Sequence, residues 1–183
     1  LRAIAVIAQV LRQQLAQLCS SLGVLAQGEW PKLRLMERFR AGAGPQGGCI
    51  LVASASFWEG FDVPGDALQL VVIDKLPFPP PGDPLVEART LQIEQSGGSA
   101  FKEYALAEAA VALKQGAGRL IRHESDRGVL VVCDSRLVRM GYGKRLIAAL
   151  PPMRRLSGAE EFHAALEDLA SVTRTSTTDQ TFL

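Results

Sequence analysis

Short, nearly continuous apolar runs are the main pattern along this chain. Four of them are rich in β-branched residues and occupy residues 3–8, 49–53, 68–73 and 129–133. Because apolar residues follow one another instead of alternating with polar ones, each run predicts a strand that is buried on both faces, as in a parallel sheet. A further short strand is predicted at residues 24–28.

The segments between these runs carry the spacing of amphipathic helices. Leucines lie four, three and four residues apart at Leu11, Leu15, Leu18 and Leu22, which predicts a helix over about 10–22 with one apolar stripe. Pro31 near the first turn and Gly42 at the end predict a second helix at 30–42. Further helices are predicted at 84–96, 100–115 and about 158–170.

The alternation of strands and helices predicts an α/β fold. We expect a doubly wound, mainly parallel sheet with helices on both faces, and ligands beyond the carboxyl ends of its strands. A length of 183 residues favours one domain. Residues 171–183 show no periodicity, so we expect a flexible tail there.

Composition places the chain among ordinary globular proteins. It has 48% hydrophobic and 21% charged residues and a formal net charge of +1, which excludes a disordered or collagen-like protein. No apolar stretch reaches the roughly 20 residues that cross a bilayer, so we expect a soluble protein with no membrane partner. Cys19, Cys49 and Cys133 are far apart and form no C-x-x-C pair. They indicate free thiols in a reducing cytoplasm and no metal site.

Positive charge is concentrated in one segment. Residues 114–155 contain ten Lys or Arg residues against three acidic ones, a local balance that favours phosphate-bearing ligands.

The string QGAGRLIR at residues 115–122 is the strongest candidate for chemistry. On a helix, Gln115, Arg119 and Arg122 would project from one face, because they lie four and three residues apart. Gly116 and Gly118 would permit a close approach of a ligand beside that face. Two guanidinium groups that point the same way suit a polyanion such as the γ-phosphate of a nucleotide.

This string resembles motif VI (Q-x-x-G-R-x-x-R) of the superfamily 2 helicases. SFWEGFDVPGDALQLVVIDKLPFPPPGDP at residues 56–84 resembles the motif V region of the DinG/YoaA branch, relatives of XPD, and residues 122–137 are similar to the continuation of that branch. The resemblance spans roughly residues 3–155. It implies that residues 1–170 are the RecA-like C-terminal motor domain of a larger helicase that moves 5′→3′ along single-stranded DNA.

The resemblance also implies roles for individual residues. Arg122 would be the arginine finger, Arg119 a second phosphate contact, and Gln115 a contact that couples the nucleotide to motion. Asp62 would act toward the ribose or the coupling network, with Gly60 admitting the backbone and Glu59 orienting the loop. The implied ATP-binding set is Gln115, Gly118, Arg119, Arg122, Glu59, Gly60 and Asp62.

The chain lacks a phosphate loop (G-x-x-x-x-G-K-[ST]) and an acidic box for Mg²⁺. We therefore expect a fragment whose ATP, with Mg²⁺, is shared with a first motor domain of the same protein, and which alone does not hydrolyse ATP. In this family an iron–sulfur cluster lies in the first domain, so one is expected only in the full-length protein and not in this chain.

Single-stranded DNA is the partner that the resemblance implies. Ser54 and Ser56 could bond its phosphates, and Phe57 and Trp58 could stack on unpaired bases. Packing of the two aromatic rings against the neighbouring loop is an equally open alternative. The basic residues between 136 and 145 face either DNA or solvent, and Asp134 and Arg136 are expected to pair and fix a loop.

Two other functions remain open. The C-terminal helix and the TDQTFL tail could dock a replication or repair protein, with a polymerase clamp-loader subunit as a candidate partner. A self-sufficient small-molecule phosphotransferase would need a phosphate loop that this chain lacks.

Overall fold

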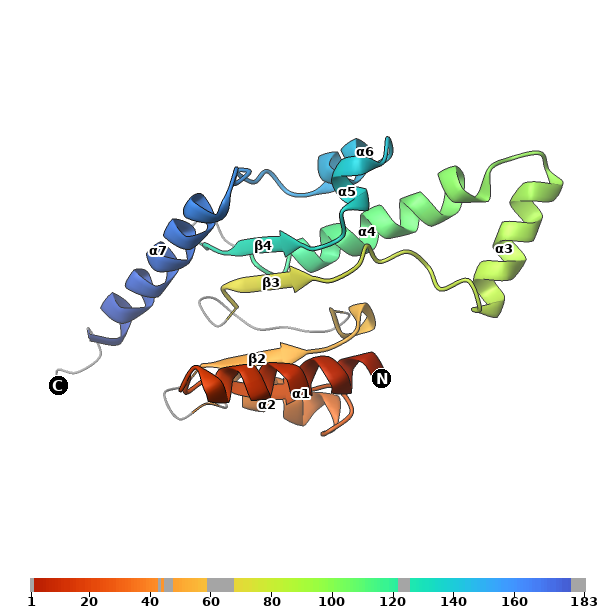
Figure 1. Ribbon diagram of the computed structural model, residues 1–183. Coiled ribbons are helices and arrows are strands. Elements are labelled where there is room, and N and C mark those ends of the chain that lie inside the picture. Colours follow the sequence, from red (N-terminus) through yellow and green to blue (C-terminus); the bar gives the residue numbers. More distant parts are fainter. Residues whose placement is uncertain (1, 43, 45–47, 59–67, 122–125, 179–183) are drawn as a thin grey trace. The chain divides into compact units, whose positions relative to one another are not determined.

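The computed structural model of the chain describes residues 2–42, 44, 48–58, 68–121 and 126–178, without the side chains of residues 58 and 172–178 (Figure 1). Two compact units divide the chain, Leu1–Val63 and Pro64–Leu183. Both combine helices with a pair of parallel strands. The predicted α/β class with parallel strands is therefore confirmed.

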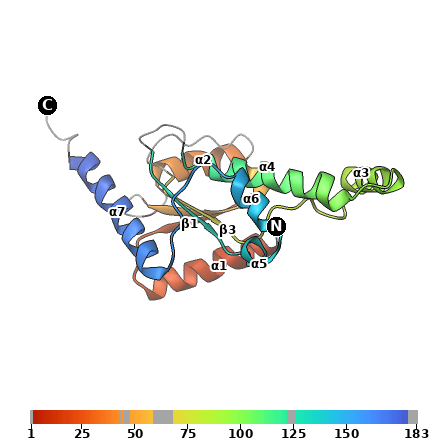
Figure 2. The ribbon, with the colours of Figure 1, turned by 90° about the horizontal axis from the view of Figure 1, so that it is seen from above.

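The first unit is a parallel strand pair between two helices. Its elements are α1 (Arg2–Gln17), β1 (Gly23–Ala26), α2 (Lys32–Ala41), β2 (Cys49–Val52) and the 3₁₀ helix η1 (Ala55–Trp58). Gly23 lies opposite Cys49 in the register of β1 and β2. Figure 2 shows α1 and α2 on opposite sides of this pair. The core contains Ile4, Ala8 and Ala26.

The strand predicted at residues 3–8 is wrong, because these residues form the first half of α1. Ile4 and Ala8 are buried, whereas Val6 and Ile7 are exposed, which is the pattern of a helix with one covered face. Alanine-rich sequence favours that helix. The helix predicted over 10–22 is present only up to Gln17, where α1 ends, and Leu18 and Leu22 beyond it are exposed.

The second unit has more helix. Its elements are β3 (Leu70–Ile73), α3 (Pro84–Gln95), the π-helix η3 (Phe101–Ala105), α4 (Leu106–Ala117), β4 (Val129–Val132), α5 (Arg136–Arg139), α6 (Gly143–Ala149) and α7 (Ala159–Thr178). Leu70 lies opposite Val129 in the parallel pair of β3 and β4. Figure 1 shows α3 away from this pair, at the end of a long connection.

Helix ends and core positions in the second unit follow from local sequence. The Asp83 side chain accepts hydrogen bonds from the backbone N–H groups of Leu85 and Val86, which caps the start of α3. Leu113 on α4 and Leu146 on α6 are completely buried, so these two helices are anchored by leucine.

Most other predicted elements are present with shorter bounds. The strands predicted at 24–28, 49–53, 68–73 and 129–133 correspond to β1 to β4. The last helix is longer than predicted, because α7 continues to Thr178, within the segment expected to be a tail. The short helices α5 and α6 were not predicted from the sequence. One RecA-like domain over 1–170 with a single doubly wound sheet stays a prediction.

Candidate functional site

A line of polar groups follows the carboxyl ends of β1 and β2. Gln27 comes directly after β1, and its side-chain Oε1 accepts hydrogen bonds from the Ser54 backbone N–H at 2.8 Å and the Ser54 hydroxyl at 2.9 Å. The Ser56 hydroxyl lies 2.9 Å from that of Ser54. Both serines are exposed. Their hydroxyl groups are thus fixed in position while they remain open to a ligand.

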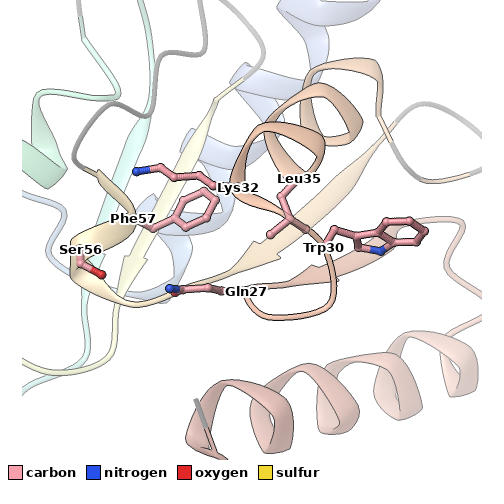
Figure 3. Close-up of a pocket in the computed structure, with 6 residues that line it drawn as sticks. All are labelled: Gln27, Trp30, Lys32, Leu35, Ser56 and Phe57. Carbon is pink, nitrogen blue, oxygen red and sulfur yellow. The ribbon is translucent and has the colours of Figure 1, made fainter.

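An open cavity of about 240 Å³ lies beside these polar groups (Figure 3). Its lining residues are Gln27, Trp30, Lys32, Leu35, Ser56 and Phe57. Trp30 is 47% exposed, and the Arg38 guanidinium carbon lies 5.0 Å from its ring centroid. The Trp30 ring, the Lys32 ammonium group and the Ser56 hydroxyl group therefore line the same opening.

Phe57 does not offer a free ring face at this site. It is only 4% exposed, and the Lys32 Nζ lies 5.2 Å from its ring centroid. Of the two alternatives for Phe57, packing is the one that the structure supports. Trp58 is the last residue of η1, but its side chain lies outside the described residues. The DNA contacts of Ser54 and Ser56 stay predictions.

Four predicted nucleotide contacts lie outside the described residues. They are Glu59, Gly60, Asp62 and Arg122.

The end of α4 differs from the helix predicted for the QGAGRLIR string. The helix ends at Ala117, and the backbone N–H of Arg119 donates to the Gly116 carbonyl in a turn. Gln115 and Arg119 therefore do not share one helical face, and that prediction is wrong. Two glycines close together lower the helix propensity of this segment, which explains why the helix stops before the arginines.

Arg119 holds an unsatisfied donor. Its Nε is buried and has no hydrogen-bond acceptor in the part of the chain that the structure describes. A buried N–H group without an acceptor costs about 1–3 kcal/mol, so such a group in a native fold calls for an explanation.

The packing of Leu120 fixes the turn that carries Arg119. Leu120 is buried, and a Cβ atom added at Gly128 would lie 2.8 Å from the Leu120 Cδ2. Gly128 immediately precedes β4, so Arg119 lies beside the amino ends of the strands. This is the opposite end from the one where strand topology predicts ligands. The turn that carries Arg119 is thus anchored by a buried leucine.

The remaining described residues of the string differ in exposure. Gln115 is exposed at the end of α4, which leaves its amide open to a partner. Gly118 has φ −66°, which any residue can adopt, although an added Cβ would lie 3.2 Å from the Lys114 carbonyl oxygen. Close packing, and not backbone conformation, is therefore what favours glycine there.

The Asp134–Arg136 pair expected to fix a loop is confirmed. The Arg136 Nε lies 3.0 Å from both carboxylate oxygens of Asp134, and its Nη2 lies 2.6 Å from Oδ2. Asp134 Oδ2 also accepts a hydrogen bond from the Leu76 backbone N–H at 3.0 Å. The pair therefore ties the turn after β4 to the loop after β3.

Electrostatics around Asp134 favour its ionised form. Its side chain is only 8% exposed. The hydrogen bonds from Arg136 hold the pKa of the Asp134 carboxyl group far below its ordinary value, burial opposes this, and the Leu76 N–H adds to it. In return, the carboxylate raises the pKa of the Arg136 guanidinium.

Sequence reasoning missed Gln27 and an aromatic cluster formed by Phe78, Phe101 and Tyr142. A polar residue at the carboxyl end of a predicted strand was the available signal for Gln27. Nothing in the sequence brings the three aromatic residues together, because they are far apart along the chain. Among the described residues, no three His, Cys, Asp or Glu side chains are grouped as metal ligands, and no helix is long and apolar enough to span a membrane.

Comparisons with known proteins match most of the chain. A family model described as a helicase C-terminal domain matches residues 2–153. The chain is 52% identical over 135 residues to the ATP-dependent DNA helicase YoaA of Escherichia coli (strain K12), which covers 74% of this chain and 21% of that protein.

Two further relatives carry the name DinG. The ATP-dependent helicase DinG of Mycobacterium tuberculosis (strain ATCC 25618 / H37Rv) is 44% identical over 150 residues, which are 82% of this chain and 22% of that protein. The 3′-5′ exonuclease DinG of Bacillus subtilis (strain 168) is 37% identical over 134 residues, which are 72% of this chain and 14% of that protein. The chain thus spans about a fifth or less of the length of these relatives.

Proposed function

This chain belongs to the helicase C-terminal domain family and is the C-terminal helicase domain of a DinG-type helicase. We propose that it is the second, RecA-like motor domain of an ATP-dependent 5′→3′ DNA helicase. In this proposal the domain has a doubly wound, mainly parallel sheet. ATP and Mg²⁺ are bound mainly by a first motor domain of the same protein. The isolated chain then has no ATPase activity, and the whole protein acts on DNA in the cytoplasm.

The buried Nε of Arg119 is the observation that carries the proposal. The neighbouring Leu120 is buried and anchors the turn that carries Arg119, yet one donor of the Arg119 guanidinium has no acceptor among the described residues. A phosphate oxygen of ATP would supply that acceptor as a charge-assisted hydrogen bond. Arg119 thus has a hydrogen-bonding capacity that the described part of this chain does not use.

Arg122 completes the nucleotide contacts in this proposal. It acts as the arginine finger when the two motor domains close on ATP, and it stabilises the charge that develops on the γ-phosphate. Gln115 is exposed and contributes a polar contact from the end of α4. Glu59, Gly60 and Asp62 belong to the same site by resemblance to motif V.

Single-stranded DNA lies along the polar line after β1 and β2 in this proposal. Ser54 and Ser56 present exposed hydroxyl groups whose positions are fixed through Gln27. Hydroxyl contacts to phosphates hold DNA without reading its sequence, as a translocating motor requires.

The test is ATP hydrolysis by the full-length protein with single-stranded DNA present. Arg122→Ala should lower kcat by about 10³- to 10⁵-fold. Arg119→Met should lower it by about 10²- to 10³-fold, as the loss of one preorganised donor does. Arg127→Gln is the matched control, because Arg127 is an exposed cation nearby. Near-normal turnover of the first two variants would contradict the proposal.

A second candidate function is docking of a replication or repair protein by α7 and the residues after it. The helicase family match ends at residue 153, so α7 lies beyond the matched domain. Its exposed face carries Glu160, Glu161, Glu167 and Asp168. A polymerase clamp-loader subunit is the partner to test.

Removal of residues 156–183 from the full-length protein separates the two functions. Loss of clamp-loader binding in a pull-down with ATPase activity intact would support docking. Unchanged binding would rule out this segment as the docking site.

A further inference from the structure

Three aromatic rings from distant parts of the second unit form a cluster beyond the carboxyl ends of β3 and β4. Phe78 follows β3, Phe101 begins the π-helix η3, and Tyr142 precedes α6. The ring centroids of Phe101 and Tyr142 are 5.2 Å apart, and Phe78 lies 5.7 and 5.9 Å from them. Phe101 remains 43% exposed. The aromatic cluster therefore presents a partly open ring to solvent.

Tyr142 lies in a segment of the sequence that is rich in basic residues and contains no acidic ones. Residues 135–158 contain six Lys or Arg and no Asp or Glu. Within α5, α6 and the turn between them, which we term the basic hairpin, Arg139, Lys144 and Arg145 are all exposed. None of these three has an ion-pair partner among the described residues.

The acidic side chains near the basic hairpin all belong to other elements. Asp134 is already engaged by Arg136, whose guanidinium carbon also lies 5.4 Å from the Phe78 ring centroid. Glu103 on η3 accepts a hydrogen bond from the Ser99 backbone N–H. Two further exposed acids lie on these elements, Asp74 directly after β3 and Glu108 on α4, the helix that packs against α6. Within the basic hairpin itself, no carboxylate accompanies the three unpaired cations.

Close packing holds the basic hairpin in one shape. A Cβ atom at Gly143 would collide with the Leu137 carbonyl oxygen, so α5 and α6 meet without room for a side chain. Leu146 on the inner side of α6 is completely buried. The cations on the outer side are therefore displayed from a fixed backbone.

We propose that the basic hairpin and the aromatic cluster form a second binding surface for single-stranded DNA. The unpaired cations of the hairpin contact the phosphates, and Phe101 stacks on an unpaired base. An exposed ring favours single strands over a duplex, because bases in a duplex are already stacked on each other. This surface rests on the proposed helicase function and takes the DNA-facing alternative for the basic residues between 136 and 145. It involves none of the residues of the proposed ATP site or of the polar line after β1 and β2.

The test measures binding of a fluorescent oligothymidylate of about 20 nucleotides to this chain by anisotropy, over a range of salt concentrations. The triple variant Arg139→Gln, Lys144→Gln and Arg145→Gln should bind at least about tenfold more weakly at low salt. Its log–log salt slope should be smaller by about 2, since each lost contact with a single strand contributes roughly 0.7. A matched triple variant, Arg2→Gln, Arg34→Gln and Arg89→Gln, removes equal charge from exposed positions elsewhere and should keep the wild-type slope.

Phe101 gives an independent measurement. Phe101→Ala should weaken binding by about tenfold without any change in the salt slope, because stacking releases no counterions. Phe101→Tyr keeps a ring and should restore affinity. Thermal unfolding of each variant checks that it is folded, and a Phe101→Ala variant that unfolds is replaced by Phe101→Leu, which fills the site without a π face.

Three results would overturn the inference. The first is an affinity and a salt slope in the basic triple variant that equal those of the wild type. The second is equal affinity of the wild-type chain for the oligothymidylate and for a duplex of the same length. The third is no measurable binding of the oligothymidylate by the wild-type chain. The ATPase test of Arg119 and Arg122 is independent of these results. Loss of ATPase activity in those variants beside unchanged DNA binding in the triple variant would refute this surface alone.

Discussion

The two ends of the β3–β4 pair hold arginines in opposite states. At the carboxyl end, Arg136 makes a forked contact with Asp134 and lies over the Phe78 ring. At the amino end, Arg119 has a buried Nε without an acceptor among the described residues. One arginine is satisfied within the chain, and the other has unused bonding capacity.

This difference separates a residue that builds the fold from one that is reserved for a ligand. The Arg136 side chain and the Asp134 carboxylate together hold two loops, so their contribution belongs to stability. An unsatisfied buried donor stabilises nothing in the isolated chain, and it is tolerated where function uses it. The state of the hydrogen bonds therefore discriminates between arginines that the sequence presents alike.

The largest expected effect on stability is at the carboxyl end of the β3–β4 pair, where Asp134 and Arg136 are bonded to each other. Asp134→Ala leaves the Leu76 N–H without its acceptor, which should lower the free energy of unfolding by about 1–3 kcal/mol. For a chain of this size, thermal unfolding should then shift down by about 3–10 °C. Ser135→Ala is the adjacent control, because the Ser135 side chain is exposed. An Asp134→Ala variant as stable as that control would remove the contrast between the two ends.

A smaller effect is expected from acid. The pKa of Asp134 is lower in the folded chain than its ordinary value of 3.8. Its contribution to stability is therefore complete above this pH and declines as the pH falls below it, because the unfolded chain then takes up a proton that the folded chain does not.

Thermal unfolding of the wild type and of Asp134→Asn should measure this decline. The stability difference between them should stay constant from neutral pH to about pH 5 and shrink below about pH 4, by at most about 1.4 kcal/mol per pH unit. A difference that grows on acidification would show that Asp134 is not held ionised by Arg136.

Three of the four apolar runs rich in β-branched residues form strands, as predicted. CILV in β2 and VLVV in β4 lie within the predicted strands. The run at 3–8 failed because its alanines favour a helix and because Ile4 and Ala8 are four residues apart. A short apolar run fits both a strand and a helix, so only the contacts of its face decide between them.

The candidate site was predictable in part for a similar reason. The Asp134–Arg136 pair is local, and a short polar sequence after a strand indicates it. The prediction that Gln115 and Arg119 share one face required a helix through both Gly116 and Gly118. The helix α4 instead ends at Ala117, between the two glycines. The burial of the Arg119 Nε and the packing of Leu120 near Gly128 are tertiary features that no spacing reveals.

The smallest expected effect on stability is at the amino end of the β3–β4 pair, where Arg119 lies. It is also the one effect expected to stabilise the chain. Arg119→Met keeps an unbranched side chain of similar reach but removes the buried donor, so the free energy of unfolding of this chain should stay the same or rise by up to about 1 kcal/mol. Arg119→Lys also removes the Nε but retains a charge. Its free energy of unfolding should lie between those of the wild type and of Arg119→Met. Chemical unfolding at neutral pH without nucleotide measures this difference. A loss of more than about 1 kcal/mol in Arg119→Met would show that the guanidinium is already bonded within the chain. It would then be a structural arginine like Arg136, with no capacity left for a phosphate.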